Sequence, residues 1–386
     1  MVENYSFENN SKFLIGDNAT YNVPYELAQL GCTRAMIVSD ETSYRIGNYD
    51  YVKGIFKLHK IAIGATFRKV QDVADSQTCE EIARRYRASN CDCIIAVGKK
   101  SAIFAAKGAK ILLTEDIRYI SHYTDEGTGN LIVRNVPLVV VPSNMGCGFE
   151  NSNFVRIVDK QLNIIYEFNT KYAETNMVAI DSSLTDTLPP KAIASHGLYA
   201  LAMAAECYVS DDSPLSVKAY ADIAIKQIYL YLEKSILHNA RKDYRSRIMG
   251  AVILAGTGFY SIPRDPISVI ADALSDRYLI NYGNLFAILF RHYIKKQELG
   301  HSFGYCLNAM LDINEYALYA RENRTQKALT AIDALYDRII DYVDFNSKLS
   351  DFDIPKEDLE SVAEDVAKTI DTVTKEQVLE LLNESY

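Results

Sequence analysis

Short apolar runs alternate with amphipathic segments over the first half of the chain. Apolar runs of strand length separated by segments of helical periodicity are typical of a parallel sheet with helices on both faces. The expected strands are residues 34–38, 93–97, 110–113 and 138–141, and the expected helices are residues 78–89 and 101–107. In such a sheet a ligand binds at the carboxyl ends of the strands. Asp40, Gly98 and Pro142 each follow or close one of these runs.

The second half of the chain has a different pattern, in which long helical periodicity replaces strand-like alternation from Pro189 onward. The expected helices are residues 190–209, 213–237, 244–254, 267–274, 285–293, 313–319 and 327–343. A last helix follows Thr374, which forms a capping box with Gln377. The change of pattern predicts an α/β domain at residues 1–184 and an all-helical domain at residues 185–386.

Composition narrows the class of protein. A length of 386 residues favours two domains, and 48% hydrophobic with 24% charged residues is typical of a globular protein. The net charge of −9 argues against nucleic acid or an anionic membrane as partner. Residues 1–12 lack the apolar core of a signal peptide, and the longest apolar runs are too short to span a bilayer. We therefore expect a cytoplasmic protein that binds neither nucleic acid nor membrane.

Cysteine usage agrees with a reducing compartment. The seven cysteines are an odd number and show no disulfide framework. Cys91 and Cys93 form a Cys-x-Cys pair, but the apolar run that follows reads as a buried strand. We expect these two side chains to be core or strand-end thiols.

Several segments resemble signature segments of one enzyme family. Residues 195–210, 282–289, 90–98 and 142–150 are similar to segments of the iron-containing alcohol dehydrogenases, in the same order along the chain. The resemblance implies an α/β N-terminal Rossmann-like domain plus an all-α C-terminal domain, the dehydroquinate synthase-like fold. It also implies NAD(P)-dependent alcohol oxidation and self-association as a homodimer. Pairing with an intact homologue is a further expectation.

The metal-ligand positions of that family carry different residues here. The resemblance places its Asp and three His ligands on Tyr199, Met203, Ser268 and Tyr282. A thioether and three neutral hydroxyl groups are poor ligands for divalent iron or zinc, so neither metal is expected. Two interpretations stay open. Tyr199 and Tyr282 could act as general acids with Asp272 as a proton relay, or the aromatic rings fill the space that a metal would leave.

The phosphate-binding loop also departs from the family pattern. Where the resemblance implies Gly-Gly-Gly-Ser, the chain has Gly98-Lys99-Lys100-Ser101. The lysines could bind another anion as point charges, or they are solvated side chains of an altered loop. Asp40 takes the place of the carboxylate that faces the adenosine ribose, but Asp is equally suited to cap a helix after a strand.

Polar residues that follow Pro142 complete the expected cofactor site, with Ser143 and Asn144 joining the loop residues and Asp40. Three functions remain open. The first is a family member without metal-dependent activity, which serves as a scaffold or binds a small anionic ligand. The second is an NAD(P)-dependent oxidoreductase of a small alcohol or aldehyde. The third is a metal-free enzyme that acts on a phosphorylated or otherwise anionic molecule.

Overall fold

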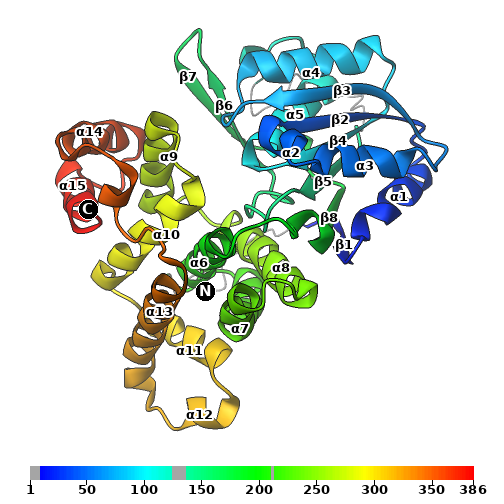
Figure 1. Ribbon diagram of the computed structural model, residues 1–386. Coiled ribbons are helices and arrows are strands. Elements are labelled where there is room, and N and C mark those ends of the chain that lie inside the picture. Colours follow the sequence, from blue (N-terminus) through cyan, green and yellow to red (C-terminus); the bar gives the residue numbers. More distant parts are fainter. Residues whose placement is uncertain (1–8, 124–135, 210–212) are drawn as a thin grey trace. The chain divides into compact units, whose positions relative to one another are not determined.

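The computed structural model describes residues 9–123, 136–209 and 213–386 and divides the chain into two compact units (Figure 1). The first unit ends at Thr187 and the second begins at Leu188. The change in hydrophobic pattern places the predicted boundary between residues 184 and 185. None of the helices in the described part of the chain is both long and apolar enough to cross a membrane.

The first unit is built on a six-stranded parallel sheet with strand order β1-β8-β5-β4-β2-β3. The strands are β1 (Lys12–Gly16), β2 (Arg34–Asp40), β3 (Ala62–Val70), β4 (Cys93–Gly98), β5 (Leu138–Pro142) and β8 (Met177–Asp181). Every residue of β4, β5 and β8 is buried, which explains why these strands read as continuous apolar runs. All carboxyl ends lie along one edge of the sheet.

Helices cover both faces of this sheet. They are α1 (Val23–Gln29), α2 (Glu41–Arg45), α3 (Asn48–Phe56), α4 (Ser76–Ala88) and α5 (Lys100–Thr114). One core cluster joins α1 and α3 to alternate strand residues such as Ala35, Ile37 and Ile95. α4 and α5 pack together, with α5 against β2, β4 and β5. The predicted α/β class of this half of the chain is confirmed.

The strand predicted at residues 110–113 is wrong, because these residues form the last turn of α5. A short apolar run fits a buried helix as well as a strand, and α5 is buried on all sides after its first residue. Its two interior lysines satisfy their ammonium groups on backbone carbonyls: Lys107 Nζ lies 2.6 Å from Phe149 O, and Lys110 Nζ lies 2.5 Å from Glu174 O. The pattern also missed β3 and an antiparallel hairpin of β6 (Phe154–Asp159) and β7 (Ile164–Asn169).

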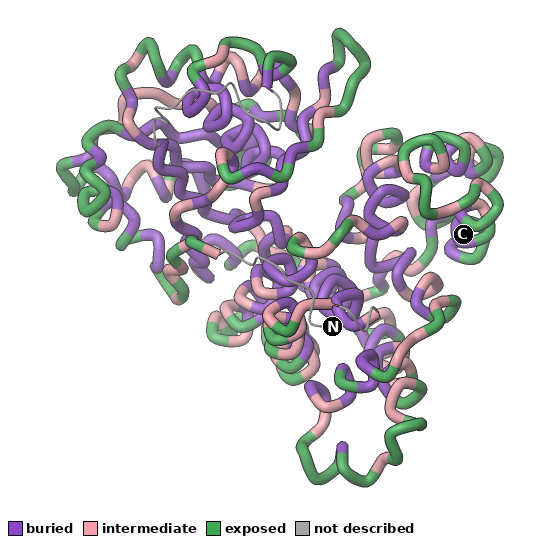
Figure 2. Tube along the Cα trace, turned by 180° about the vertical axis from the view of Figure 1, so that it is seen from behind, coloured by how far each residue is buried: buried purple, intermediate pink, exposed green. Residues whose placement is uncertain are grey.

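The second unit contains only helices among its described residues. They are α6 (Pro190–Glu206), α7 (Leu215–Leu237), α8 (Lys242–Phe259), α9 (Pro266–Tyr278), α10 (Tyr282–Tyr293), α11 (Tyr305–Met310), α12 (Ile313–Ala317), α13 (Arg321–Val343), α14 (Leu359–Thr369) and α15 (Lys375–Glu384). α6 is the most buried of the long helices of this unit and contacts α7, α8, α10 and α13. Figure 2 shows buried backbone concentrated in the interior of each unit.

The predicted helices of this half are present, and the start of α15 is confirmed in detail. Thr374 Oγ1 accepts the Gln377 amide at 3.3 Å, and the Gln377 side chain accepts the Thr374 amide at 2.9 Å. Helices α11 and α14 were not predicted. The two halves together give the expected α/β domain followed by an all-α domain.

Candidate functional site

Asp40 lies at the carboxyl end of β2 and is 2% exposed. Its Oδ1 accepts the Ser43 amide at 2.8 Å, and its Oδ2 accepts the Ser43 hydroxyl at 2.9 Å and the Lys99 amide at 2.8 Å. Asp40 is therefore the N-cap of α2 and also fixes the loop after β4. The structure shows Asp40 in the capping role, and its role in binding an adenosine ribose stays a prediction.

Gly98 is required by this arrangement. A Cβ atom at Gly98 would lie 2.1 Å from Asp40 Oδ2 and 2.7 Å from the Ala102 side chain. Both distances are far below van der Waals contact, so no larger residue fits between the end of β4 and Asp40. The first position of the altered phosphate loop thus keeps its glycine for a steric reason.

The two lysines of the loop are held by neighbouring side chains. Lys99 Nζ is 3.2 Å from Thr42 Oγ1 and 3.4 Å from Asp72 Oδ1. Lys100 Nζ lies over the Phe149 ring at 5.1 Å from its centroid and near the Phe104 ring at 5.6 Å. These contacts draw the lysines toward β3 and toward the 142–150 segment respectively, rather than leaving them fully solvated.

The remaining predicted cofactor residues lie close to this loop. The Ser143 hydroxyl donates to the Ser43 hydroxyl oxygen at 2.7 Å, and Asn144 Oδ1 accepts the Gly146 amide at 3.0 Å. Ser101, in the first turn of α5, is 4% exposed, and its hydroxyl makes no hydrogen bond to any described residue. The structure therefore brings Asp40, Gly98–Ser101 and Ser143 together at the carboxyl edge of the sheet.

The N-terminus of α5 fits the diphosphate of a nucleotide cofactor. The helix has 15 residues and no side-chain cap, and the unpartnered Ser101 hydroxyl lies in its first turn. Uncapped backbone amides and the helix dipole favour a bound anion at this position. The two lysines add positive charge beside it.

A buried lysine that the sequence did not single out anchors the 142–150 segment. Lys107 Nζ donates to Phe149 O at 2.6 Å and to Ser152 O at 2.5 Å. Burial lowers the pKa of Lys107 to about 7, while Cys147 and Glu150 act in the opposite direction. Glu150 is fully buried and accepts the Cys147 amide at 2.6 Å. This network orders the segment that follows β5.

In the helical unit, two of the positions that the resemblance assigns to metal ligands, Tyr199 and Tyr282, belong to a packed aromatic cluster. The Tyr199 ring on α6 meets the Tyr282 ring at 5.7 Å and the Phe286 ring at 5.4 Å, both edge to face. The Tyr199 hydroxyl is hydrogen-bonded to that of Tyr260 at 2.7 Å. Met203, one turn further along α6, is fully buried. The side chains of these residues fill the space between α6, α8 and α10.

Acidic groups lie next to this cluster. Ser268 donates its hydroxyl to Asp265 at 2.8 Å, and Asp265 caps α9. Burial raises the pKa of Glu206 on α6 well above its usual value, and the charge of Asp265 raises it further. Asp272 pairs with Arg264 at 2.6 Å. Sequence spacing gave no signal for Glu206 or Arg264, because their neighbours Asp265 and Asp272 lie on another element or beyond one helical turn.

These side chains do not fit iron or zinc at the family's position. The Ser268 hydroxyl is donated to Asp265, and burial raises the pKa of Tyr282, with Asp272 adding to the shift, so its phenolate is strongly disfavoured. His196, the nearest histidine along α6, bonds through Nδ1 to the Ala192 carbonyl of its own helix at 2.8 Å. The raised pKa of Tyr282 also makes this residue a weaker general acid.

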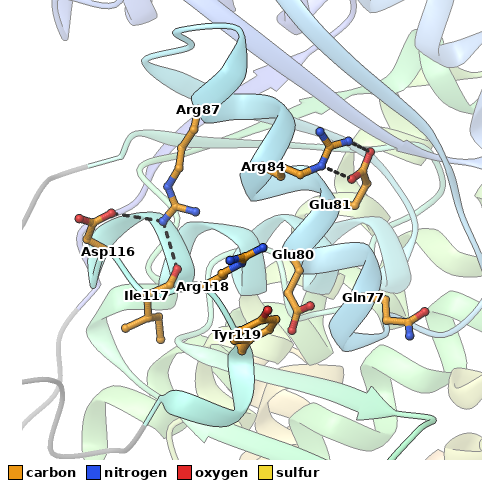
Figure 3. Close-up of a pocket in the computed structure, with 9 residues that line it drawn as sticks. All are labelled: Gln77, Glu80, Glu81, Arg84, Arg87, Asp116, Ile117, Arg118 and Tyr119. Atoms are coloured by element: carbon orange, nitrogen blue, oxygen red, sulfur yellow. Dashed lines mark hydrogen bonds and ion pairs between the residues drawn. The ribbon is translucent and has the colours of Figure 1, made fainter.

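A pocket of the first unit lies away from these residues, between α4 and residues 116–119 (Figure 3). It has a volume of about 570 Å³ and is lined by Gln77, Glu80, Glu81, Arg84, Arg87, Asp116, Ile117, Arg118 and Tyr119. Arg84 forms a bidentate pair with Glu81, and Arg87 contacts Asp116 and the Ile117 carbonyl. None of the predicted site residues lines it.

Comparison with known proteins identifies the family. Residues 10–182 match the family model "Iron-containing alcohol dehydrogenase", and residues 193–386 match the C-terminal model "Fe-containing alcohol dehydrogenase family, C-terminal". The chain belongs to the iron-containing alcohol dehydrogenase family. The resemblance inferred from the signature segments is thereby confirmed.

Relatives of this iron-containing alcohol dehydrogenase family member are distant in sequence and close in fold. Long-chain-alcohol dehydrogenase 1 of Geobacillus thermodenitrificans is 24% identical over 92% of the chain and 88% of its own length. Alcohol dehydrogenase 4 of Schizosaccharomyces pombe is 25% identical over 88% of the chain and 80% of its own length. The solved structure of a 1,3-propanediol oxidoreductase has a TM-score of 0.87 at 20% identity, with both chains fully covered.

Proposed function

We propose that this family member binds a nucleotide or a similar diphosphate-bearing ligand and does not carry out metal-dependent alcohol oxidation. It would act as a pseudoenzyme with a ligand-binding or scaffold role. The observation that carries the proposal is the aromatic cluster that includes two of the four expected ligand positions. Tyr199 and Tyr282 pack edge to face there, and Ser268 is committed to Asp265.

The physical argument rests on the donor groups. A ferrous or zinc ion polarises an alcohol or carbonyl only when several anionic or imidazole donors converge on it. Here the donors are a thioether and three neutral hydroxyls, and exchanging one of them would not restore the set. By contrast, the N-terminus of α5 keeps what a diphosphate needs, including Gly98 and the buried Ser101 hydroxyl.

A calorimetric titration tests both halves of the proposal. We expect NAD(H), NADP(H) or ADP-ribose to bind the purified chain, and binding to weaken in Lys99→Ala and Lys100→Ala because each removes a positive charge near the anion. We expect no oxidation of simple alcohols after addition of Fe²⁺ or Zn²⁺. Alcohol oxidation that depends on added Fe²⁺ would contradict the proposal, as would the absence of any nucleotide binding at millimolar concentrations.

An NAD(P)-dependent oxidoreductase is the second candidate. It is supported by the Asp40–Gly98 geometry and by the names of relatives, among them an NAD-dependent methanol dehydrogenase of Bacillus methanolicus and an NADPH-dependent butanol dehydrogenase of Clostridium saccharobutylicum. Metal-independent turnover with NAD(P)H and an aldehyde would favour it. We further propose assembly as a homodimer, to be checked by light scattering on the eluting protein.

A further inference from the structure

Two cysteines and an aspartate meet at the amino edge of the sheet, opposite the edge that holds Asp40 and Gly98. Cys32 lies just before β2, and Asp92 and Cys93 lie at the start of β4. β2 and β4 are hydrogen-bonded neighbours in which Ala35 pairs with Cys93. The sulfur atoms of both cysteines and a carboxylate oxygen of Asp92 all lie within 4.8 Å of one another.

The carboxylate in this group is held in place by its neighbours. Asp92 Oδ2 accepts the Thr33 amide at 2.7 Å and the Thr33 hydroxyl at 2.7 Å, and Oδ1 accepts the Arg34 amide at 2.9 Å. Oδ1 therefore keeps a lone pair for a further partner. Hydrogen bonds of this kind orient a carboxylate before a metal ion binds.

The two thiols are buried, whereas the carboxylate reaches the surface. Cys32 is 6% exposed and Cys93 is fully buried. Asp92 is half-buried and its neighbours Thr33 and Arg34 are exposed. An ion would thus enter from the side of Asp92 and be shielded on the side of the sulfurs.

We infer that Cys32, Asp92 and Cys93 bind one zinc ion, or a similar thiophilic divalent cation, with water as the fourth ligand. With Zn–S distances of about 2.3 Å, two sulfur ligands of a tetrahedral site lie roughly 3.8 Å apart. This distance is compatible with the sulfur atoms of Cys32 and Cys93, which lie within 4.8 Å of each other. Binding would release both thiol protons to solvent, so the affinity rises with pH. The ion would tie β2 to β4, and this inference does not depend on the proposed function.

Cobalt substitution gives the most direct readout. The full chain, reduced and freed of metal, is titrated with Co²⁺ without oxygen, and we expect thiolate-to-cobalt charge-transfer absorption that saturates at one ion per chain. Zinc should displace the cobalt and erase the absorption. A competition titration with a chromophoric chelator then gives the zinc affinity.

Substitutions assign the ligands. Cys32→Ser and Cys93→Ser should each weaken zinc binding by about 100-fold or more, whereas Thr33→Val, which removes only a partner of Asp92, should weaken it by about 10-fold. Cys79→Ser is the matched control, because Cys79 is a fully buried thiol on α4 of the same unit. It should leave zinc affinity unchanged.

Three results would overturn the inference. The first is an absence of charge-transfer absorption in the reduced wild-type chain, which needs no variant to fold. The second is unchanged zinc affinity in Thr33→Val and in both cysteine variants. The third is a Cys32–Cys93 disulfide that forms in air while the reduced chain binds no cobalt, which would make the pair a redox pair and not a metal site.

Discussion

Single residues at the carboxyl edge of the sheet keep tight steric relations although the loop sequence has changed. Gly98 contacts Asp40 so closely that the glycine cannot be replaced, while the next two loop positions accept lysine because their side chains point to Asp72 and to Phe149. The resemblance predicts lysines at two glycine positions of the family's loop, and the contact of Gly98 with Asp40 shows which glycine the backbone requires.

Gly98→Ala tests this relation. The new methyl group would overlap Asp40 Oδ2 at 2.1 Å, so the strand end or the α2 cap must shift. We expect the free energy of unfolding to fall by about 1–3 kcal/mol, as is typical of overpacking, together with loss of nucleotide binding. Urea denaturation followed by circular dichroism measures the change.

Gly250→Ala is the control for Gly98→Ala, since a Cβ at Gly250, inside α8, meets nothing within 4 Å. It should raise stability by about 0.5–1 kcal/mol, because alanine favours a helix over glycine. A denaturation midpoint of Gly98→Ala equal to that of wild type would show that the contact between Gly98 and Asp40 is not formed.

At the scale of elements, α6 brings Glu206 close to Asp265 at the start of α9, and both carboxyl groups are buried. Burial raises the pKa of Glu206, followed by repulsion from Asp265. Below the ordinary pKa of a glutamate, the Glu206 carboxyl is protonated in both the folded and the unfolded chain. As the pH rises above that value the unfolded chain ionises first, so wild type loses stability.

Glu206→Gln removes this loss. We expect the variant to be more stable than wild type by about 1–3 kcal/mol at pH 8, because glutamine has no ionisation that favours the unfolded chain, with a difference that shrinks as the pH falls toward 5. Thermal unfolding across this pH range is the measurement. Glu298→Gln, at an exposed position, should show no such trend. A constant difference between Glu206→Gln and wild type at every pH would contradict the raised pKa.

Elements also show where sequence patterns suffice. Local signals predicted β2, β4, β5 and the helices of the second half except α11 and α14, because burial on both faces of a strand or on one stripe of a helix leaves a period in the sequence. The edge strand β3 and the β6–β7 hairpin are partly exposed and leave weaker periods. The grouping of Cys32 with Cys93 needed the pairing of β2 with β4, which no local pattern contains.

At the scale of the whole molecule, the chain has the fold of an enzyme family, and the proposed function rests on the residues that the resemblance assigns to that family's metal position. The fold and family could be predicted from ordered segments spread over the chain, and both are confirmed. For the site, the sequence predicted only which residues stand at the expected ligand positions. Their hydrogen-bond partners, such as Tyr260 for Tyr199, come from elements distant in sequence.

Introducing the four metal ligands that the family pattern implies tests whether these four positions alone prevent metal binding. The variant Tyr199→Asp, Met203→His, Ser268→His and Tyr282→His should unfold at a lower temperature than wild type without metal, because it replaces packed aromatic rings and buries an uncompensated carboxylate. Fe²⁺ added without oxygen should then raise its unfolding temperature, since binding at 100 times the dissociation constant stabilises by about 2.7 kcal/mol.

The restored variant is best made in a Cys32→Ser, Cys93→Ser background, so that ions cannot bind at the amino edge of the sheet. The matched control is the same background with the four natural residues, for which we expect no shift with Fe²⁺. Equal shifts in both proteins would mean that the natural residues already hold the metal, and the pseudoenzyme proposal would fail. No shift in either would mean that the four positions do not converge. A shift confined to the restored variant would assign the loss of metal chemistry to these four side chains, because the rest of the fold would then be shown to support it.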